Sequence, residues 1–155
     1  MPRPSRPVWI GLGLAAVVGM VASEALGSRP QATDADAPVP PCPDTPNCAR
    51  LRLAVAATPL AVTEAVHRAF GGLGDTGLGP PAAFAPTPRG ALASFAVGPF
   101  QDEVAVEVEP APRGSVLWVR SASEKGRSDL GVNRRRAQRI VEAVAAGLPP
   151  DAVGR

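Results

Sequence analysis

The stretch RSASEKGRSDLGVNRRR, residues 120–136, connects the last predicted strand of this 155-residue chain to its last predicted helix. The preceding residues 115–121, SVLWVRS, are rich in β-branched and aromatic side chains, which is typical of a strand. Residues 120–136 are polar, contain Gly126 and Gly131, and end on three consecutive arginines. This segment, called the junction below, is where we expect a functional site.

Two more strands precede the junction. Residues 103–109, EVAVEVE, alternate strictly between valine and other residues, so the valines share one face and Glu103, Glu107 and Glu109 share the other. Residues 91–97, ALASFAV, alternate less regularly. The turn-forming residues 110–114, PAPRG, predict an antiparallel hairpin between 103–109 and 115–121. A strand with one polar face predicts a sheet that helices cover on one side.

Two segments have the punctuation and spacing of helices. Thr58 suits the N-cap, Pro59 the first helical position and Gly71 the end of the first helix. The second predicted helix covers residues 130–146. Its apolar stripe contains Ala137, Ile140, Val141, Val144 and Leu148, as that of the first contains Val62, Ala65, Val66, Ala69 and Phe70. Residues 73–90 are rich in Gly and Pro and predict an irregular connection. The expected fold is therefore α+β, an antiparallel sheet of at least three strands with helices on one face.

The N-terminal region predicts export. Residues 8–23 are uncharged and follow Arg3 and Arg6, so residues 1–28 are expected to form a hydrophobic signal-anchor helix whose N-terminus stays in the cytoplasm. Residues 29–41 form a linker rich in Pro and Ala, and residues 42–150 form one domain. We expect a single-pass protein of the cell membrane with its domain on the periplasmic, extracytoplasmic side. Secretion after signal cleavage is the alternative.

The two cysteines, Cys42 and Cys48, enclose the turn-forming residues PDTPN, which favours a disulfide outside the cytoplasm. Free thiols and a metal site are the alternatives. Two thiols and His67, the only histidine, do not complete a tetrahedral zinc site, so no metal or cofactor is predicted. A net charge of +2 does not indicate a nucleic-acid-binding protein.

The site prediction comes from the charge of the junction. A helix start carries partial positive charge, so arginines 134–136 need a counter-charge. Internal acids are one interpretation: Asp129 caps the helix, and Asp102 or Glu103 pairs with Arg120 or with one of the three arginines. The other is a pocket for phosphate, carboxylate or a lipid headgroup. Its candidate ligand-binding residues are Arg120, Ser121, Ser123, Arg127, Ser128 and Arg134, with structural support from Asp102, Glu103, Asp129 and Asn133.

Three motifs resemble one known family. They are CPDTPNC at 42–48, FQDE at 100–103 before a valine-rich strand, and VRSASEKGRSDLGVNRRR at 119–136. Over about residues 42–148 the chain resembles the bacterial and plastid proteins gathered as domain-of-unknown-function family 1499. The resemblance implies an exported or membrane-associated α+β domain and supplies no catalytic residues. This chain has Asp102-Glu103 where relatives usually carry two aspartates, and Glu124 where they often carry arginine.

Three functions follow from these observations. The first is a non-enzymatic, membrane-tethered module that binds an anionic group or a partner protein through the junction. The second is a structural accessory subunit in which Arg120 pairs with Asp102 and Asn133 bonds to the loop backbone. The third is a hydrolase that uses Ser121, Ser123 or Ser128, which requires His67 to lie beside one of these serines.

Overall fold

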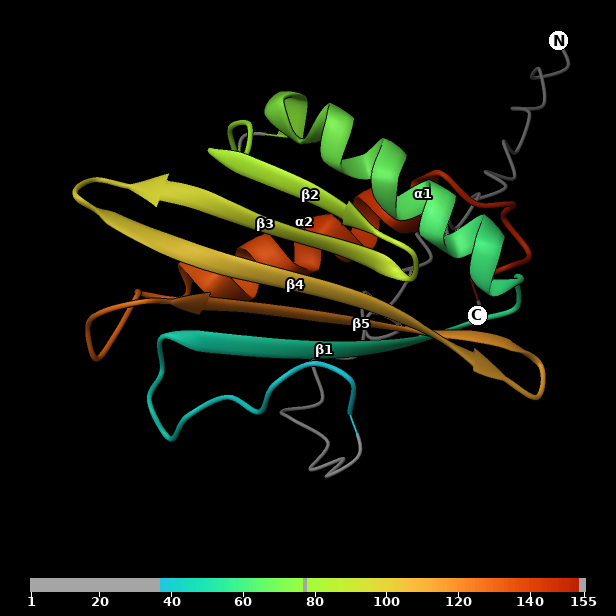
Figure 1. The fold of residues 1–155 in the computed structure, drawn as a ribbon, viewed down its shortest axis with the longest axis horizontal. Helices are drawn as coiled ribbons and strands as arrows, with labels where there is room; N and C mark the ends of the chain where they lie inside the picture. The colour runs from blue at the N-terminus through green and yellow to red at the C-terminus, as the bar shows by residue number, and fades with distance from the viewer. Residues whose placement is uncertain (1–36, 77, 154–155) are drawn as a thin grey trace, which may run out of the picture.

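The computed structural model describes residues 37–76 and 78–153 (Figure 1). Its elements, in chain order, are β1 (Cys48–Val55), α1 (Pro59–Gly72), the short 3-10 helix η2 (Leu73–Thr76), β2 (Ala83–Thr87), β3 (Gly90–Val97), β4 (Phe100–Ala111), β5 (Gly114–Ser123) and α2 (Val132–Ala146). The strands form one antiparallel sheet in the order β1-β5-β4-β3-β2. The predicted α+β class and the three predicted strands are confirmed.

Two strands were not predicted. In β1 the apolar residues Ala49, Leu51, Leu53 and Val55 alternate with other residues, so the signal of a strand was present in the sequence. Strand β2 lies inside the segment 73–90, which was predicted to be irregular, and that prediction is wrong there. Pro86 interrupts its sequence pattern, but proline is tolerated on the edge of a sheet, where β2 lies.

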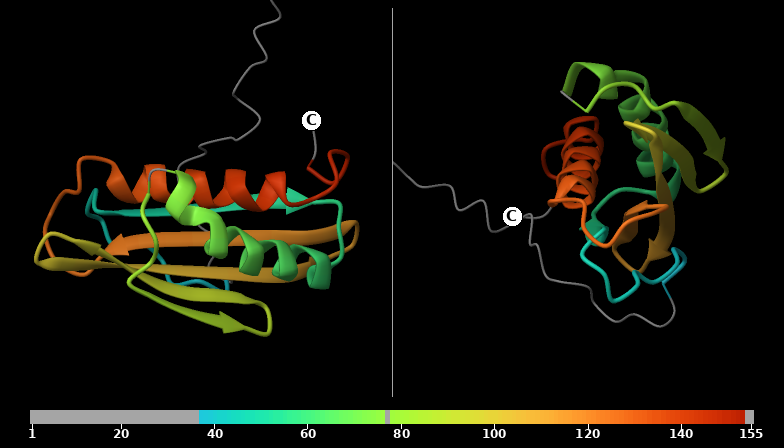
Figure 2. Two further views of the ribbon diagram at one scale, coloured as in Figure 1. Left: turned by 90° about the horizontal axis from the view of Figure 1, so that it is seen from above. Right: turned by 90° about the vertical axis from the view of Figure 1, so that its left-hand side faces the viewer.

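Both helices cover the same face of the sheet (Figure 2). Thr58 caps α1 by accepting a hydrogen bond from the Ala61 backbone N–H at 3.3 Å, as predicted. All ten residues of the two predicted apolar stripes are buried. They pack against the inward side chains of the strands, which include Phe95, Val104, Val106, Val108, Leu117 and Val119. The core therefore lies between the helices and this covered face.

The hairpin between β4 and β5 is tighter than the predicted five-residue loop. Strand β4 continues to Ala111 and β5 begins at Gly114, which has a φ of 125°. A Cβ at this position would lie 2.1 Å from the Val55 carbonyl oxygen. Only glycine fits this approach of β5 to the end of β1.

The opposite face of the sheet, called the open face, is covered by no described helix. Residues 37–41, called the strap, contact it through Ala37 and Val39, which pack with Val116 and Trp118 of β5. After the strap, Cys42 and Cys48 form the predicted disulfide. The predicted hydrophobic helix and most of the linker lie outside the described residues. Within residues 37–76 and 78–153, no helix combines the length and hydropathy needed to span a bilayer.

Candidate functional site

The junction divides between the two faces of the sheet. Successive side chains of a strand point to opposite faces, so Arg120 and Ser121 of β5 separate. Ser121 is fully buried on the covered face, beside the start of α2. Arg120 lies on the open face, opposite Ala105 of β4. The predicted site residues therefore do not form one cluster.

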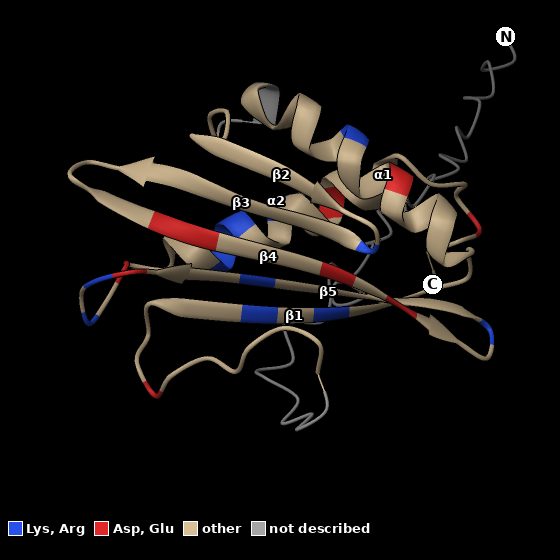
Figure 3. Ribbon diagram, viewed as in Figure 1, with Lys and Arg blue, Asp and Glu red and all other residues tan. Residues whose placement is uncertain are grey.

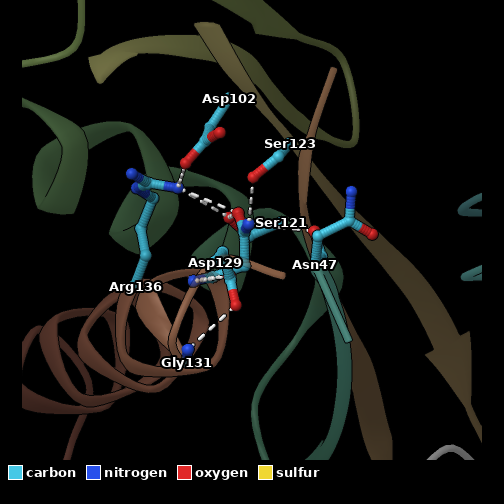
Figure 4. Close-up of polar contacts among 8 residues, drawn as sticks. Asn47, Asp102, Ser121, Ser123, Asp129, Gly131 and Arg136 are labelled. Atoms are coloured by element: carbon cyan, nitrogen blue, oxygen red, sulfur yellow. Dashed lines mark hydrogen bonds and ion pairs between the residues drawn. The ribbon is translucent and has the colours of Figure 1, made fainter. Parts of the chain in front are cut away.

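On the covered face, Arg136 is the centre of a buried polar network (Figure 4). Its Nη1 donates to Asp102 Oδ2 at 2.7 Å, to Ser121 Oγ at 3.1 Å and to Asn133 Oδ1 at 2.9 Å. The guanidinium also lies 4.8 Å from the centre of the Phe95 ring. Because both charged side chains are only 3–5% exposed, this ion pair is shielded from water and held by hydrogen bonds.

Asn133 extends the network to the N-terminal part of the domain. Its Oδ1 accepts from Ser121 at 2.6 Å, and its Nδ2 donates to Ser123 Oγ at 2.8 Å and to the Asn47 carbonyl at 3.0 Å. Asn47 Nδ2 in turn donates to the Gly126 carbonyl at 2.6 Å. The network thus connects α2, β5, β4, the loop after β5 and the disulfide loop.

This arrangement corrects one predicted pair. Asp102 pairs with Arg136, whereas Arg120 lies on the other face of the sheet and makes no ion pair with Asp102. An internal acid therefore supplies the counter-charge of Arg136, the last of the three consecutive arginines, as one of the two interpretations predicted. Asn133 does bond to loop backbone, as the structural hypothesis required.

Asp129 supports the start of α2, although Gly131 occupies the N-cap position. Its carboxylate accepts from the backbone N–H of Gly131 at 2.8 Å and of Asn133 at 2.6 Å. Burial by itself would raise the pKa of Asp129, but these backbone hydrogen bonds outweigh it and hold the pKa below the ordinary value. Asp129 thus accepts from backbone N–H groups at the helix start, although it lies two residues before the N-cap and is not the N-cap residue itself.

The other predicted residues of the junction face solvent. Arg127, Ser128 and Arg134 are exposed, and so are Arg135 and Arg139 of α2. Ser128 Oγ accepts a long hydrogen bond of 3.4 Å from the Leu130 backbone N–H. The structure does not bring Arg127 or Arg134 together with Arg120 in a shared cavity.

The open face carries a groove of about 470 Å³. Four strands and the strap line it, through Pro40, Ala83, Phe84, Ala85, Leu92, Ala93, Ser94, Glu103, Val104, Ala105 and Arg120. Most of these residues are apolar, and Leu92 is 51% exposed. The charged side chains in the groove are those of Arg120 and Glu103. Figure 3 shows the acidic residues along β4 and the basic ones on the neighbouring β5 and β1.

Arg120 has an unusual environment for a charged side chain. Its Nε is buried, yet no described residue accepts a hydrogen bond from it. Glu103 belongs to the same groove, but no ion pair joins the two side chains in the described part of the chain. A guanidinium is a strong donor for carboxylate and phosphate oxygens. Arg120 is thus the predicted ligand-binding residue that lines a cavity and has a buried Nε that no described residue satisfies.

Neither hydrolytic nor metal chemistry gains support from the geometry. His67 Nε2 makes a hydrogen bond of 2.8 Å with the Gly90 carbonyl, and its ring lies against Phe84. The three candidate serines have other partners: Ser121 bonds to Asn133 and Arg136, Ser123 to Asn133, and Ser128 to the Leu130 backbone N–H. Residues 37–76 and 78–153 contain no cluster of three or more His, Cys, Asp or Glu suited to a metal ion.

The sequence did not distinguish Arg136 from the two arginines before it, and Asn47 was not expected in the polar network. Arg136 carried a usable signal, because the apolar stripe of α2 continues by one turn toward the N-terminus. Positions 133, 136, 137, 140, 141 and 144 follow one helical face, and all six are buried. Asn47 carried no comparable signal, since its contacts with Gly126 and Asn133 span 79 and 86 residues.

Of the comparisons with known proteins, the family model agrees with the resemblance found in the motifs. No curated protein matches the chain. The crystal structure of protein CV1439 from Chromobacterium violaceum is similar at 15% identity and a TM-score of 0.40, over 65% of this chain and 96% of that one. A family model matches residues 38–144, which is more than half of the chain. The chain therefore belongs to the family described as Protein of unknown function (DUF1499).

Proposed function

We propose that this chain is a non-enzymatic, membrane-tethered binding module on the extracytoplasmic side. Its ligand is an anionic amphiphile, a molecule with one acidic group and an apolar body, and its site is the groove of the open face. The hydrophobic run at residues 8–23 and the disulfide support the location. The environment of Arg120 supports the binding site.

The observation that carries the proposal is a guanidinium, in a mainly apolar groove, whose buried Nε has no acceptor among the described residues. A buried donor without an acceptor is unfavourable, and a bound carboxylate or phosphate would satisfy it. Such a hydrogen bond to a charged group contributes about 1.5–3 kcal/mol. The alanines and Leu92 beside Arg120 would contact the apolar body of the ligand. A concave, mainly apolar site with a few polar groups is typical of small-molecule binding.

The exposed arginines of the junction are a weaker choice for the same ligand. Arg127 and Arg134 lie in solvent, where salt screens their charge and no described apolar cavity adjoins them. The groove combines a cation with apolar surface, which these positions do not. A partner protein that inserts an acidic side chain would use the same chemistry, and it is an alternative outcome of the test.

The test uses the full chain in nanodiscs of a zwitterionic lipid, with Trp9→Phe so that Trp118 is the only tryptophan. Octyl phosphate, inorganic phosphate and octanol are titrated while the fluorescence of Trp118, which lies two residues from Arg120, is followed. We expect octyl phosphate to bind more tightly than either of its fragments. Equal affinity for inorganic phosphate would show that the apolar lining contributes nothing, and would contradict the proposal.

Matched variants locate the site. Arg120→Gln should weaken octyl phosphate binding by about 10–150-fold, the equivalent of the lost charged hydrogen bond. Ala85→Leu, at an exposed position of β2, should weaken it by filling the groove. Arg134→Gln is the control and should bind as the parent does. If Arg134→Gln lost binding and Arg120→Gln did not, the site would be the exposed junction instead.

A structural role is the second candidate, and the buried network favours it for the covered face. Asp102, Ser121, Asn133 and Arg136 bond to one another, and Arg136 Nε is the atom of this group that has no acceptor among the described residues. Under this alternative the domain is an accessory subunit without a ligand. Binding that depends on Arg120 would rule it out as the complete function.

A further inference from the structure

The strap forms one wall of the groove. Val39 is only 1% exposed, because it packs against Val116 and Trp118 on the open face. The next residue, Pro40, lines the groove together with Arg120. The position of Val39 on β5 therefore determines where this wall stands.

Few interactions hold the strap. No backbone hydrogen bond joins residues 37–44 to another described residue, and the contacts that place the strap are the apolar ones of Ala37 and Val39. The disulfide adds a covalent cross-link to the peptide segment 43–47, because it joins Cys42, directly after the strap, to Cys48 at the start of β1. Asn47 is fixed independently by its bonds to Gly126 and Asn133. The position of Cys48 is therefore fixed by its neighbour Asn47 and by β1, and the disulfide fixes the position of Cys42 relative to Cys48.

We infer that the Cys42–Cys48 disulfide controls ligand occupancy of the open-face groove by holding the strap in place, an inference that rests on the proposed function. Reduction by a dithiol breaks the S–S bond. Two electrons and two protons pass to the cysteines, and the dithiol becomes a disulfide. Cys42 is then joined to β1 through the peptide segment 43–47 alone, and among the described residues the strap is held by the apolar contacts of Ala37 and Val39. Without the strap the groove loses Pro40, and a ligand bound to Arg120 loses one wall.

Trp118 reports the state of the strap even without a ligand. It is 4% exposed, and its indole N–H donates to Glu109 at 3.1 Å. The strap residue Val39 is part of its cover. Release of the strap should expose the indole, so its emission should shift to longer wavelength and acrylamide should quench it more strongly.

The experiment compares the full chain carrying Trp9→Phe, in nanodiscs, before and after treatment with dithiothreitol. We expect reduction to raise acrylamide quenching of Trp118 and to weaken octyl phosphate binding at least tenfold. The double variant Cys42→Ser/Cys48→Ser should behave like the reduced protein and should not respond to dithiothreitol. Circular dichroism checks that the sheet and helices remain.

A second variant makes the test independent of the cysteines. Val39→Ser keeps the disulfide but removes the apolar contact, so it should raise quenching and weaken binding partway toward the reduced protein. If reduction changes neither quenching nor affinity while Arg120→Gln still abolishes binding, the strap inference is wrong and the proposed groove remains. If the oxidised protein binds no octyl phosphate, the proposed function fails, and unchanged quenching would then also overturn the strap inference.

Discussion

Arg136 and Arg120 belong to the same junction, yet they lie on opposite faces of the sheet in opposite surroundings. The Arg136 guanidinium donates to three oxygen acceptors and stacks on the Phe95 ring. The Nε atoms of both arginines are buried without an acceptor among the described residues, so the difference lies elsewhere: Arg136 has an ion pair, whereas Arg120 lines a groove and forms no ion pair in the described part of the chain. The alternation of β5 and the register of the sheet separate the two arginines.

The difference teaches that a cluster of basic residues in sequence is not a cluster in space. Arginines at 134–136 share a helix start, but the 3.6-residue period turns only Arg136 toward the core. There it meets Asp102, whose charge the fold also had to compensate. Arg120 instead lines the open-face groove with Glu103 and mainly apolar residues. We therefore expect the covered face to contribute stability and the open face to carry the proposed binding, and the predictions below test this division.

The largest expected effect is that of Arg136→Met. Methionine keeps much of the packing against Phe95 but leaves the Asp102 carboxylate buried without its ion pair. Removal of one partner of a buried pair typically costs about 3–5 kcal/mol. The free energy of unfolding, measured by urea denaturation, should fall by this amount. Arg135→Met, at an exposed position of the same helix turn, is the control and should change stability by less than about 0.5 kcal/mol.

Asn133→Ala should have the next largest effect. It removes an acceptor used by Ser121 and Arg136 and a donor used by Ser123 and the Asn47 carbonyl. Leaving such buried groups unsatisfied costs about 1–3 kcal/mol. Urea denaturation should give this loss, and hydrogen exchange should show faster opening of the loop after β5. A loss below about 0.5 kcal/mol would mean that the network adds little to the stability of the covered face.

Asp129→Asn should have a smaller effect that depends on pH. The carboxylate accepts through both oxygens, whereas an amide offers one, so about 1 kcal/mol should be lost at pH 7. Hydrogen bonds lower the pKa of Asp129 in the folded state, so the stabilisation is present above the unfolded-state pKa of about 3.9. It disappears as the pH falls through the folded-state pKa.

Urea denaturation of parent and variant between pH 7 and pH 2.5 checks this prediction. The difference in unfolding free energy should shrink as the pH is lowered. Glu124→Gln changes an exposed acid of the same loop and should show no comparable pH-dependent difference. If the difference in unfolding free energy between parent and variant stayed constant across this pH range, the charge of Asp129 would not stabilise the start of α2.

Much of the fold could be predicted from sequence, because local patterns specify it. The alternating valines of β4 and the apolar stripes of α1 and α2 predict which of their side chains are buried, and these side chains are buried in the structure. Strand β2 escaped prediction because Pro86 removes the strand pattern, and only its place on the sheet edge makes proline acceptable.

The candidate site was harder to predict, because its partners depend on strand register. The sequence places Asp102 near no arginine, and pairing β4 with β5 brings it to Ser123 and then to α2. The groove likewise needs Ala85, Leu92 and Ala105 to align in one row with Arg120, and this row is a property of the whole sheet. Residue types therefore indicated the charged groups but not which of them stay unpaired.

The smallest expected effect, and the sharpest test of the comparison, is the stability of Arg120→Met. This variant makes the same change as Arg136→Met but on the open face, where no described acid loses its partner. Because it also removes a buried donor without an acceptor, we expect the free energy of unfolding to stay within about 0.5 kcal/mol of the parent or to rise slightly. A loss of unfolding free energy near that of Arg136→Met would show that Arg120 stabilises the fold. It would then remove the main reason to propose Arg120 as a ligand-binding residue.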